Sequence, residues 1–159
     1  MRVTSLALIA LETSSDRCDS SRKSSESAIL VVTVEGVSVA VILIVEDDVF
    51  IREIAEMMIQ DWGHETLSAG DVDEALLILR SAQHIDALFT DIYLKNLVVG
   101  GCDLAHEAIA LRPGLRVLYT TGNTVNEKMQ ALFIAGTQCL RKPYTQYQLQ
   151  DCFTALLPA

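Results

Sequence analysis

Short apolar runs alternate with amphipathic segments along most of the chain after residue 40. The runs are rich in Val, Ile and Leu with little polar alternation, which is typical of strands buried on both faces of a parallel sheet. Strands are expected at residues 41–45, 65–69, 85–90, 116–119 and 138–141. Helices are expected at residues 50–62, from 71, at 104–112, 126–135 and from 145. This alternation predicts an α/β fold with a doubly wound, five-stranded parallel sheet, whose right-handed crossovers place the five helices on both faces.

The starts of three helices carry capping signals. In each, an Asp or Thr is followed three residues later by Glu or Gln, as in a capping box: Asp71-x-x-Glu74, Thr124-x-x-Glu127 and Thr145-x-x-Gln148. The first helix is expected to carry an apolar face, formed by Phe50, Ile54, Met57 and Met58. The last helix is expected to turn inward its residues Leu149, Cys152, Phe153 and Leu156.

Residues 1–38 do not follow this pattern and are interpreted as an extension that is poorly structured or adds a strand. A Ser-rich, charged stretch within them has the composition of a disordered segment. The apolar run near the N-terminus has only Arg2 as a basic start, and Glu12 follows it where a signal peptide would have its small-residue cleavage site. The apolar stretch 28–45 approaches membrane-spanning length, but Glu35 and Gly36 interrupt it. We therefore expect one functional domain at residues 39–159, without an output domain and without a membrane segment.

The acidic balance of the chain, a formal net charge of -9 at pH 7, argues against direct nucleic-acid binding. Phosphate backbones are bound through clustered Lys and Arg, and no such cluster is present. The four cysteines are scattered without a CxxC pair, which argues against a zinc site or a disulfide framework. Reduced thiols in a cytoplasm are expected instead. The three histidines lack the sequence surroundings of a phosphate carrier.

Charged residues follow three of the predicted strands. Glu46, Asp47 and Asp48 come directly after the first strand, Asp91 follows the third, and Lys142 follows the fifth. Because the carboxyl ends of parallel strands meet at one edge of the sheet, these side chains are expected to lie close together. Carboxylates crowded there need a cation to offset their repulsion. A hard divalent cation beside a lysine that binds an anion is an arrangement suited to phosphoryl transfer.

Four motifs, taken together in this order, resemble the receiver domain of a response regulator in a two-component phosphorelay. They are Val45-Glu46-Asp47-Asp48, Thr90-Asp91-Ile92-Tyr93-Leu94, Tyr119-Thr120-Thr121-Gly122-Asn123 and Leu140-Arg141-Lys142-Pro143-Tyr144. The resemblance covers roughly residues 41–157. It implies a flavodoxin-like fold with strand order 2-1-3-4-5. It further implies a stand-alone, cytoplasmic phosphoacceptor switch similar to chemotaxis regulators, rather than an enzyme.

The resemblance also implies how the acidic residues act. Asp91 would be the phosphoacceptor, taking its phosphoryl group from the phosphohistidine of a sensor histidine kinase or of a histidine phosphotransfer protein. Mg²⁺ would be held directly by Asp47, by Asp91 and by the main-chain carbonyl of Tyr93. Glu46 would hold the same ion through water. In-line phosphoryl transfer needs positioning and charge neutralisation more than covalent help, so this residue set suits the reaction.

The remaining motif residues would bind the phosphoryl group and pass on the signal. By the same resemblance, Thr121 would donate its hydroxyl to a phosphoryl oxygen and Lys142 would pair with the acyl phosphate. The peptide bond between Lys142 and Pro143 would be cis. A downstream protein target would bind the face formed by the fourth helix, the fifth strand and the fifth helix.

The chain departs from the family pattern at two places. Family members usually carry an aromatic residue three positions before the lysine, and here that position is Cys139. A cysteine cannot move inward as an aromatic ring does, so we expect it to fill core volume and the usual coupling to Thr121 to be lost or weak. The loop at residues 93–101 is also longer than usual. Its apolar residues, at 97–99, either cover a partner surface or pack on the following helix.

Three other classes of protein fit these motifs less well. A toprim-type nucleic-acid enzyme and a haloacid-dehalogenase-like phosphatase both require Asp-x-Asp, but residue 93 is Tyr93. A nucleotide-binding domain requires a Gly-rich phosphate loop after the first strand, which the chain lacks. Two alternatives stay open: a receiver-like interaction module that is not phosphorylated, and a receiver that is part of a hybrid kinase.

Overall fold

The structure is a computed structural model, and it describes residues 39–95, 97 and 99–157. The prediction for residues 1–38 lies outside the described part of the chain. The boundary of the functional domain therefore stays a prediction.

Five parallel strands form one sheet in the order β2-β1-β3-β4-β5, as predicted. The strands are β1 (Val41–Val45), β2 (Glu65–Ala69), β3 (Ala87–Asp91), β4 (Arg116–Thr121) and β5 (Gln138–Arg141). The helices are α1 (Val49–Gln60), α2 (Val72–Leu79), α3 (Gly100–Leu111), α4 (Glu127–Gln130) and α5 (Gln146–Leu156). The predicted doubly wound α/β fold is confirmed. No helix within the described ranges has the length and apolar character needed to cross a membrane.

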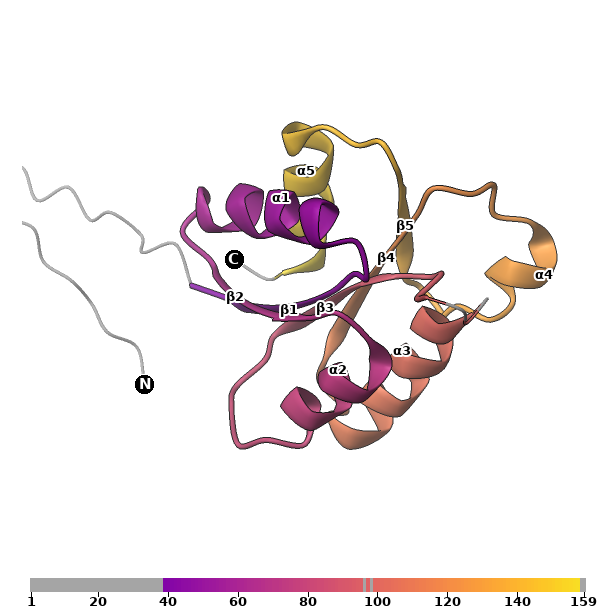
Figure 1. Ribbon diagram of the computed structural model, residues 1–159, viewed down its shortest axis with the longest axis horizontal. Helices are drawn as coiled ribbons and strands as arrows, with labels where there is room; N and C mark the ends of the chain where they lie inside the picture. The colour runs from indigo at the N-terminus through magenta and orange to yellow at the C-terminus, as the bar shows by residue number, and fades with distance from the viewer. Residues whose placement is uncertain (1–38, 96, 98, 158–159) are drawn as a thin grey trace, which may run out of the picture. The chain divides into compact units, whose positions relative to one another are not determined.

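The sheet separates two apolar cores. Figure 1 shows α1 and α5 on one face of the sheet and α2 and α3 on the other. Side chains of β1 alternate between the cores, with Leu43 in the core on the α2 and α3 side and Ile44 in the opposite one. All five residues of β3 are buried. A strand buried on both faces explains why its sequence reads as a continuous apolar run.

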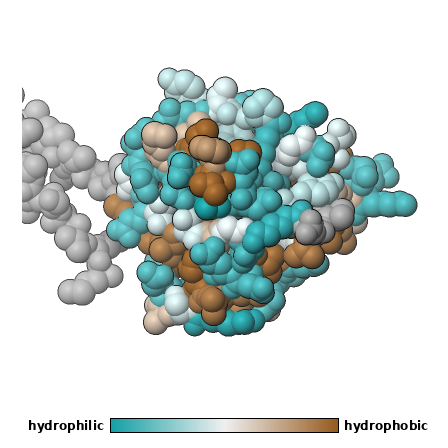
Figure 2. Space-filling model, in the orientation of Figure 1, coloured by the Kyte–Doolittle hydropathy of each residue, from teal (hydrophilic) through white to brown (hydrophobic). Residues whose placement is uncertain are grey.

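The apolar face predicted for α1 is wrong for Phe50, Ile54 and Met57, whereas the fourth predicted residue, Met58, is half-buried and packs against the core. The helix buries Ala55 and Ile59 against the sheet, whereas Phe50 is 77% exposed, Met57 59% and Ile54 47%. Both sets of residues recur at helical spacing, so the pattern alone did not decide which one faces the core. The small Ala55 lets the helix lie close to the sheet. Figure 2 shows hydrophobic surface over α1 as a result.

Helix α4 is shorter than predicted. It spans only Glu127–Gln130, and its N-cap is Asn126, whose side chain accepts a hydrogen bond from the Met129 amide, instead of the predicted Thr124. The chain continues in turns, and the ring of Phe133 stacks on Tyr119 with ring centroids 4.5 Å apart. This long-range stack holds the segment after α4 against the sheet in a non-helical path.

The starts of α2 and α5 agree more closely with the sequence, whereas α3 begins at Gly100, before the predicted start at residue 104. Thr145 forms the predicted capping box with Gln148 at the start of α5. Asp71 caps α2 through the Glu74 amide, but the Glu74 side chain accepts from Gly70 instead of closing the box on Asp71. Helix α5 turns its predicted residues inward, with two buried and two half-buried against the core: Leu149, Phe153, Cys152 and Leu156.

Candidate functional site

Acidic side chains from two neighbouring strands meet at the carboxyl edge of the sheet. Glu46 and Asp47 follow β1 directly, and Asp91 ends β3, which pairs with β1. One carboxylate oxygen from each of the three residues lies within 4.8 Å of the others. Glu46 and Asp91 are 4% and 8% exposed, whereas Asp47 is exposed. Carboxylates this close repel one another, so the cluster needs a neighbouring positive charge.

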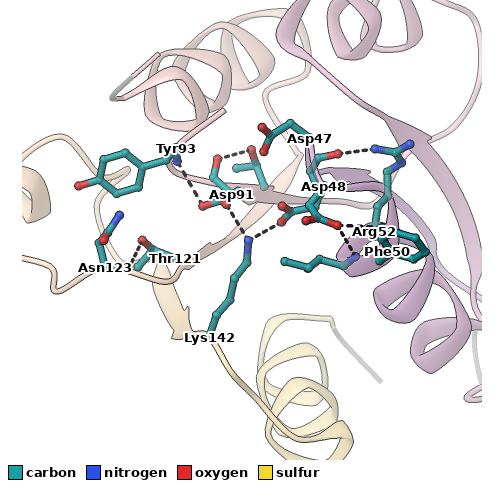
Figure 3. A network of polar contacts seen from close by, with 12 residues as sticks. Asp47, Asp48, Phe50, Arg52, Asp91, Tyr93, Thr121, Asn123 and Lys142 are labelled. Carbon is teal, nitrogen blue, oxygen red and sulfur yellow. Dashed lines mark hydrogen bonds and ion pairs between the residues drawn. The ribbon is translucent and has the colours of Figure 1, made fainter. Parts of the chain in front are cut away.

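Lys142 supplies a positive charge from the other side of the site. Its Nζ donates hydrogen bonds to Glu46 Oε2 at 2.5 Å and to Asp91 Oδ2 at 2.6 Å, as Figure 3 shows for Asp91. The peptide bond between Lys142 and Pro143 is cis, as predicted. Burial lowers the pKa of Lys142, but its bonds to Asp91 and Glu46 outweigh burial, and the net pKa is raised. Lys142 is therefore charged at neutral pH.

The charged form of the Glu46 carboxyl is disfavoured where it lies. Burial raises its pKa above the ordinary value, and the hydrogen bond and charge of Lys142 only partly offset this effect. The Asp91 carboxylate adds to the rise by repulsion. A carboxylate in this situation gains from any further cation that reaches it.

Asp91 is held in place by its strand and by a glycine. Its side-chain Oδ1 accepts a hydrogen bond from the Tyr93 amide at 3.2 Å. At the start of α3, the Gly101 amide donates to the Ile92 carbonyl at 3.1 Å. A Cβ atom at residue 101 would overlap the main-chain carbonyl of Asp91, so the helix can approach β3 this closely only with glycine. Sequence reasoning identified a Gly-containing loop but not this contact.

The third acid of the predicted cluster has a structural role. Asp48 is the N-cap of α1, and its Oδ1 accepts from the amides of Phe50 at 2.9 Å and Ile51 at 3.2 Å. The neighbouring Arg52 donates from Nη1 to the main-chain carbonyl of Glu46 at 2.5 Å. An Asp directly before a helix is a known capping signal that could have assigned Asp48 from the sequence. Glu46, Asp47 and Asp91 remain as the cation-binding candidates.

Thr121 and Tyr93 lie at the side of the site away from α1 (Figure 3). Thr121 is buried at the end of β4, and its Oγ1 accepts from the Asn123 amide at 3.1 Å. The Lys142 amide donates to the Thr121 carbonyl at 2.8 Å, which ties the end of β4 to Lys142. The Tyr93 hydroxyl donates to Met129 Sδ of α4 at 3.6 Å. The structure thus brings all of the predicted site residues to one edge of the sheet.

One residue near the site had no sequence signal. The Lys95 amide donates to Asp47 Oδ2 at 3.2 Å, and the Lys95 side chain donates to Asp71 Oδ2 at 2.6 Å. These two contacts join the loop after β3 to the loop after β1 and to the loop before α2. They cross 48 and 24 positions of sequence, so no local pattern could have predicted them.

Cys139 lies half-buried on β5, paired in register with Tyr119 of β4. It packs against the core on the α3 side, as expected of a residue that fills core volume. Beside it is a surface cavity of about 410 Å³, lined also by Thr121, Phe133 and Arg141. Burial raises the pKa of the Cys139 thiol to about 11. The thiol is therefore protonated at neutral pH and is a weak nucleophile there.

The three clustered carboxylates fit a hard divalent cation. Mg²⁺ prefers oxygen ligands and is usually bound through one or two carboxylates together with waters. The cluster offers two buried acids and one exposed acid, with an open side at Asp47 through which water can complete the coordination. No cysteine or histidine is part of this cluster, so the donor set does not favour zinc.

With this fold and this site, the chain belongs to the response regulator receiver domain family. The family model matches residues 42–154, which include the acidic cluster, Thr121 and Lys142. A phosphoacceptor switch of two-component signalling is the class of protein that this family defines. Membership sets aside the toprim-type and phosphatase readings.

Known relatives agree with this family. A response regulator receiver protein from Anaeromyxobacter sp. (strain Fw109-5) is 30% identical over 89 residues, which are 56% of this chain and 36% of that protein. The chain thus spans little more than a third of that relative. The crystal structure of a receiver domain protein from Methanospirillum hungatei JF-1 has a TM-score of 0.67 at 25% identity, covering 74% of this chain and 93% of that one. The chemotaxis protein CheY4 of Vibrio cholerae has a TM-score of 0.66 at 26% identity, covering 76% and 100%.

Proposed function

We propose that this chain accepts a phosphoryl group on Asp91 from the phosphohistidine of a sensor histidine kinase or histidine phosphotransfer protein. The observation that carries the proposal is the 2.6 Å contact between Lys142 Nζ and Asp91 Oδ2. It places a charged lysine beside the acid on β3, at an edge shared with two further carboxylates. The alternative of an interaction module without phosphorylation has no comparable observation in its favour.

In the proposed reaction, a carboxylate oxygen of Asp91 attacks phosphorus while the bond from phosphorus to the donor imidazole nitrogen breaks. The leaving imidazole keeps the electron pair of that bond and takes a proton. Lys142 neutralises negative charge on the phosphoryl oxygens, and Thr121 donates its hydroxyl to one of them. The Tyr93 amide, which binds Asp91 Oδ1, fixes the orientation of the attacking carboxylate.

The residues proposed to hold Mg²⁺ are Glu46 through water, and Asp47, Asp91 and the Tyr93 carbonyl directly. When bound, the ion neutralises charge that develops on the transferred group. The chain's own contribution is to keep Asp91 on a buried, rigid strand while leaving Asp47 open to solvent. We place the chain in the cytoplasm, where its phosphodonors are expected.

Asp91 phosphorylation is proposed to be read by a protein target at the face of α4, β5 and α5. The site is connected to that face by the hydrogen bond from Tyr93 to Met129 of α4 and by the chain itself, since Lys142 directly follows β5. To move a two-state equilibrium from 1:99 to 99:1, phosphorylation must favour one state by about 5.5 kcal/mol. Because Cys139 stands where family members usually carry an aromatic residue, Tyr93 and Lys142 would couple phosphorylation to the target-binding face.

The test is intact-mass measurement after incubation with Mg²⁺ and a small acyl phosphate donor. The wild type should gain the mass of one phosphoryl group, and Asp91→Asn should gain none. Asp103→Asn, which alters an exposed aspartate of α3, serves as the matched control and should be phosphorylated like the wild type. Equal phosphorylation of Asp91→Asn and the wild type would refute the proposal. Absence of phosphorylation from both a small donor and a phosphohistidine protein would favour the interaction module.

A further inference from the structure

Lys95 connects the candidate cation site to the start of α2. Its main-chain amide donates to Asp47 Oδ2 at 3.2 Å, and its ammonium donates to Asp71 Oδ2 at 2.6 Å. The other oxygen of Asp71, Oδ1, accepts from the Glu74 amide at 2.9 Å and caps α2. A continuous series of contacts, here called the Asp71–Lys95–Asp47 bridge, therefore runs from the helix to the carboxylate.

The backbone at Lys95 has an unusual conformation. Its φ is +52°, and among the described residues it is the one non-glycine residue with positive φ. It lies in a tight turn in which the Leu97 amide donates to the Leu94 carbonyl at 2.9 Å. Glycine adopts this conformation without steric cost, whereas a lysine does so only when its surroundings hold it there. The ion pair with Asp71 is such a restraint.

Asp47 depends on this bridge more than its two neighbours do. Glu46 and Asp91 are buried and bind Lys142, whereas Asp47 is exposed. Within the described part of the chain, the Asp47 carboxylate accepts one hydrogen bond, and it comes from the Lys95 amide. An exposed carboxylate without it would rotate freely, and binding a cation would then cost the entropy of fixing the side chain.

We propose that Lys95 is a positioning residue for the cation, holding Asp47 toward Glu46 and Asp91 through its anchor on Asp71. This inference rests on the proposed function, because it concerns the same cation site. Lys95 acts through Asp47 and does not itself contact the metal. The groups that hold metal ligands in place commonly influence affinity by an order of magnitude or more.

Simple electrostatics predicts the opposite result, which makes the inference testable. The Lys95 ammonium carries positive charge close to an acidic cluster. If charge alone mattered, removing it would strengthen the binding of a dication. If Lys95 positions Asp47, removing its side chain weakens binding, because the turn loses its anchor and Asp47 loses its orientation.

The experiment is isothermal titration of the full chain with Mg²⁺ alone. Lys95→Met, which keeps the side-chain length without the charge, should weaken Mg²⁺ binding by about tenfold. Lys95→Arg, which can restore the ion pair with Asp71, should bind within about twofold of the wild type on the same reasoning. Lys128→Met removes an exposed lysine of α4 and is the matched control for lost charge. It should bind Mg²⁺ like the wild type.

A double-mutant cycle with Asp71→Asn tests the bridge directly. Asparagine keeps an oxygen that can cap α2, so the helix start is preserved while the ion pair with Lys95 is lost. Asp71→Asn should weaken Mg²⁺ binding, and combining it with Lys95→Met should weaken it no further. Two independent charge effects would have opposite signs and would cancel in the double variant.

Tighter or unchanged Mg²⁺ binding by Lys95→Met, in a variant that unfolds at the wild-type temperature, would overturn the inference. So would cancelling effects in the double variant. In either case, a wild type that binds Mg²⁺ and is phosphorylated on Asp91 would leave the proposed function intact. A wild type that neither binds Mg²⁺ nor accepts phosphate would remove both proposals together.

Discussion

The carboxyl edge of the sheet is built differently at its β1 and β3 end and at its β4 and β5 end. At the β1 and β3 end, all of β3 is buried, and Glu46 and Asp91 are bound by Lys142. At the β4 and β5 end, Leu140 is the one buried residue of β5, and α4 has only four residues. A cavity of about 410 Å³ lies beside this second end. The first end holds its carboxylates in a buried, hydrogen-bonded arrangement, and the second has the sparse packing expected of a segment that opens locally.

The largest effect should come from Gly101→Ala. The added Cβ overlaps the main-chain carbonyl of Asp91, and neither backbone can move without displacing α3 from β3. We expect a loss of about 3 kcal/mol in the free energy of unfolding, measured by urea denaturation. Gly114→Ala is the control, since a Cβ there meets nothing within 4 Å. A Gly101 variant as stable as the Gly114 variant would show that the first end is not rigid.

Lys142→Met should have the next largest effect. It leaves the buried carboxylates of Glu46 and Asp91 without their hydrogen-bond donor, which should cost about 2 kcal/mol in the free energy of unfolding without metal. Added Mg²⁺ should then stabilise this variant more than the wild type, because the ion replaces the lost charge. Thermal unfolding with and without Mg²⁺ measures both effects. Equal stabilisation of the two proteins by Mg²⁺ would contradict this account of Lys142.

Phe133→Ala tests the second end. Losing the stack on Tyr119 should cost about 1 kcal/mol in the free energy of unfolding and speed amide hydrogen exchange in the segment after α4. Mg²⁺ affinity should stay at the wild-type value, because the acidic cluster belongs to the other end. Leu132→Ala, at a neighbouring residue that is 42% exposed, is the control. A changed Mg²⁺ affinity in Phe133→Ala alone would show that the two ends are coupled through the stack.

The smallest effect concerns the reactivity of Cys139. Because burial raises its pKa to about 11, only about 0.1% of this thiol is ionised at pH 8. Alkylation of Cys139 in the folded protein should be slow and should speed up about tenfold per pH unit below that pKa. Peptide mass spectrometry after timed alkylation, with the urea-unfolded chain as reference, measures the rate. Equally fast labelling in both states would mean that the thiol is not shielded.

The sequence predicted the sheet well because parallel strands buried on both faces have continuous apolar runs. The same reasoning brought Glu46, Asp47, Asp91, Thr121 and Lys142 to one edge, where the structure also places them. Their roles in phosphoryl transfer stay predictions. Three of the four residues predicted for the buried face of α1 were wrong, because two apolar stripes share that helix and only packing against the sheet selects Ala55 and Ile59.

Other features depend on contacts between distant residues. After the short α4, Phe133 stacks on Tyr119. Helix propensity is a local property and cannot predict this contact between distant residues. The role proposed for Lys95 rests on an ion pair between two loops, and no local sequence pattern indicates the positive φ of this lysine. Asp48 is different, since its capping role could have been inferred from its place before the helix.

The sequence separations within the site have a consequence for how the protein is made. Lys142 lies 51 positions after Asp91 and 96 positions after Glu46, yet it binds both. Contacts between such distant residues form late, because loop closure must precede them. On the ribosome, the acidic cluster therefore emerges before the lysine that neutralises it. A nascent chain cannot have a complete site until β5 has been synthesised and has joined the sheet.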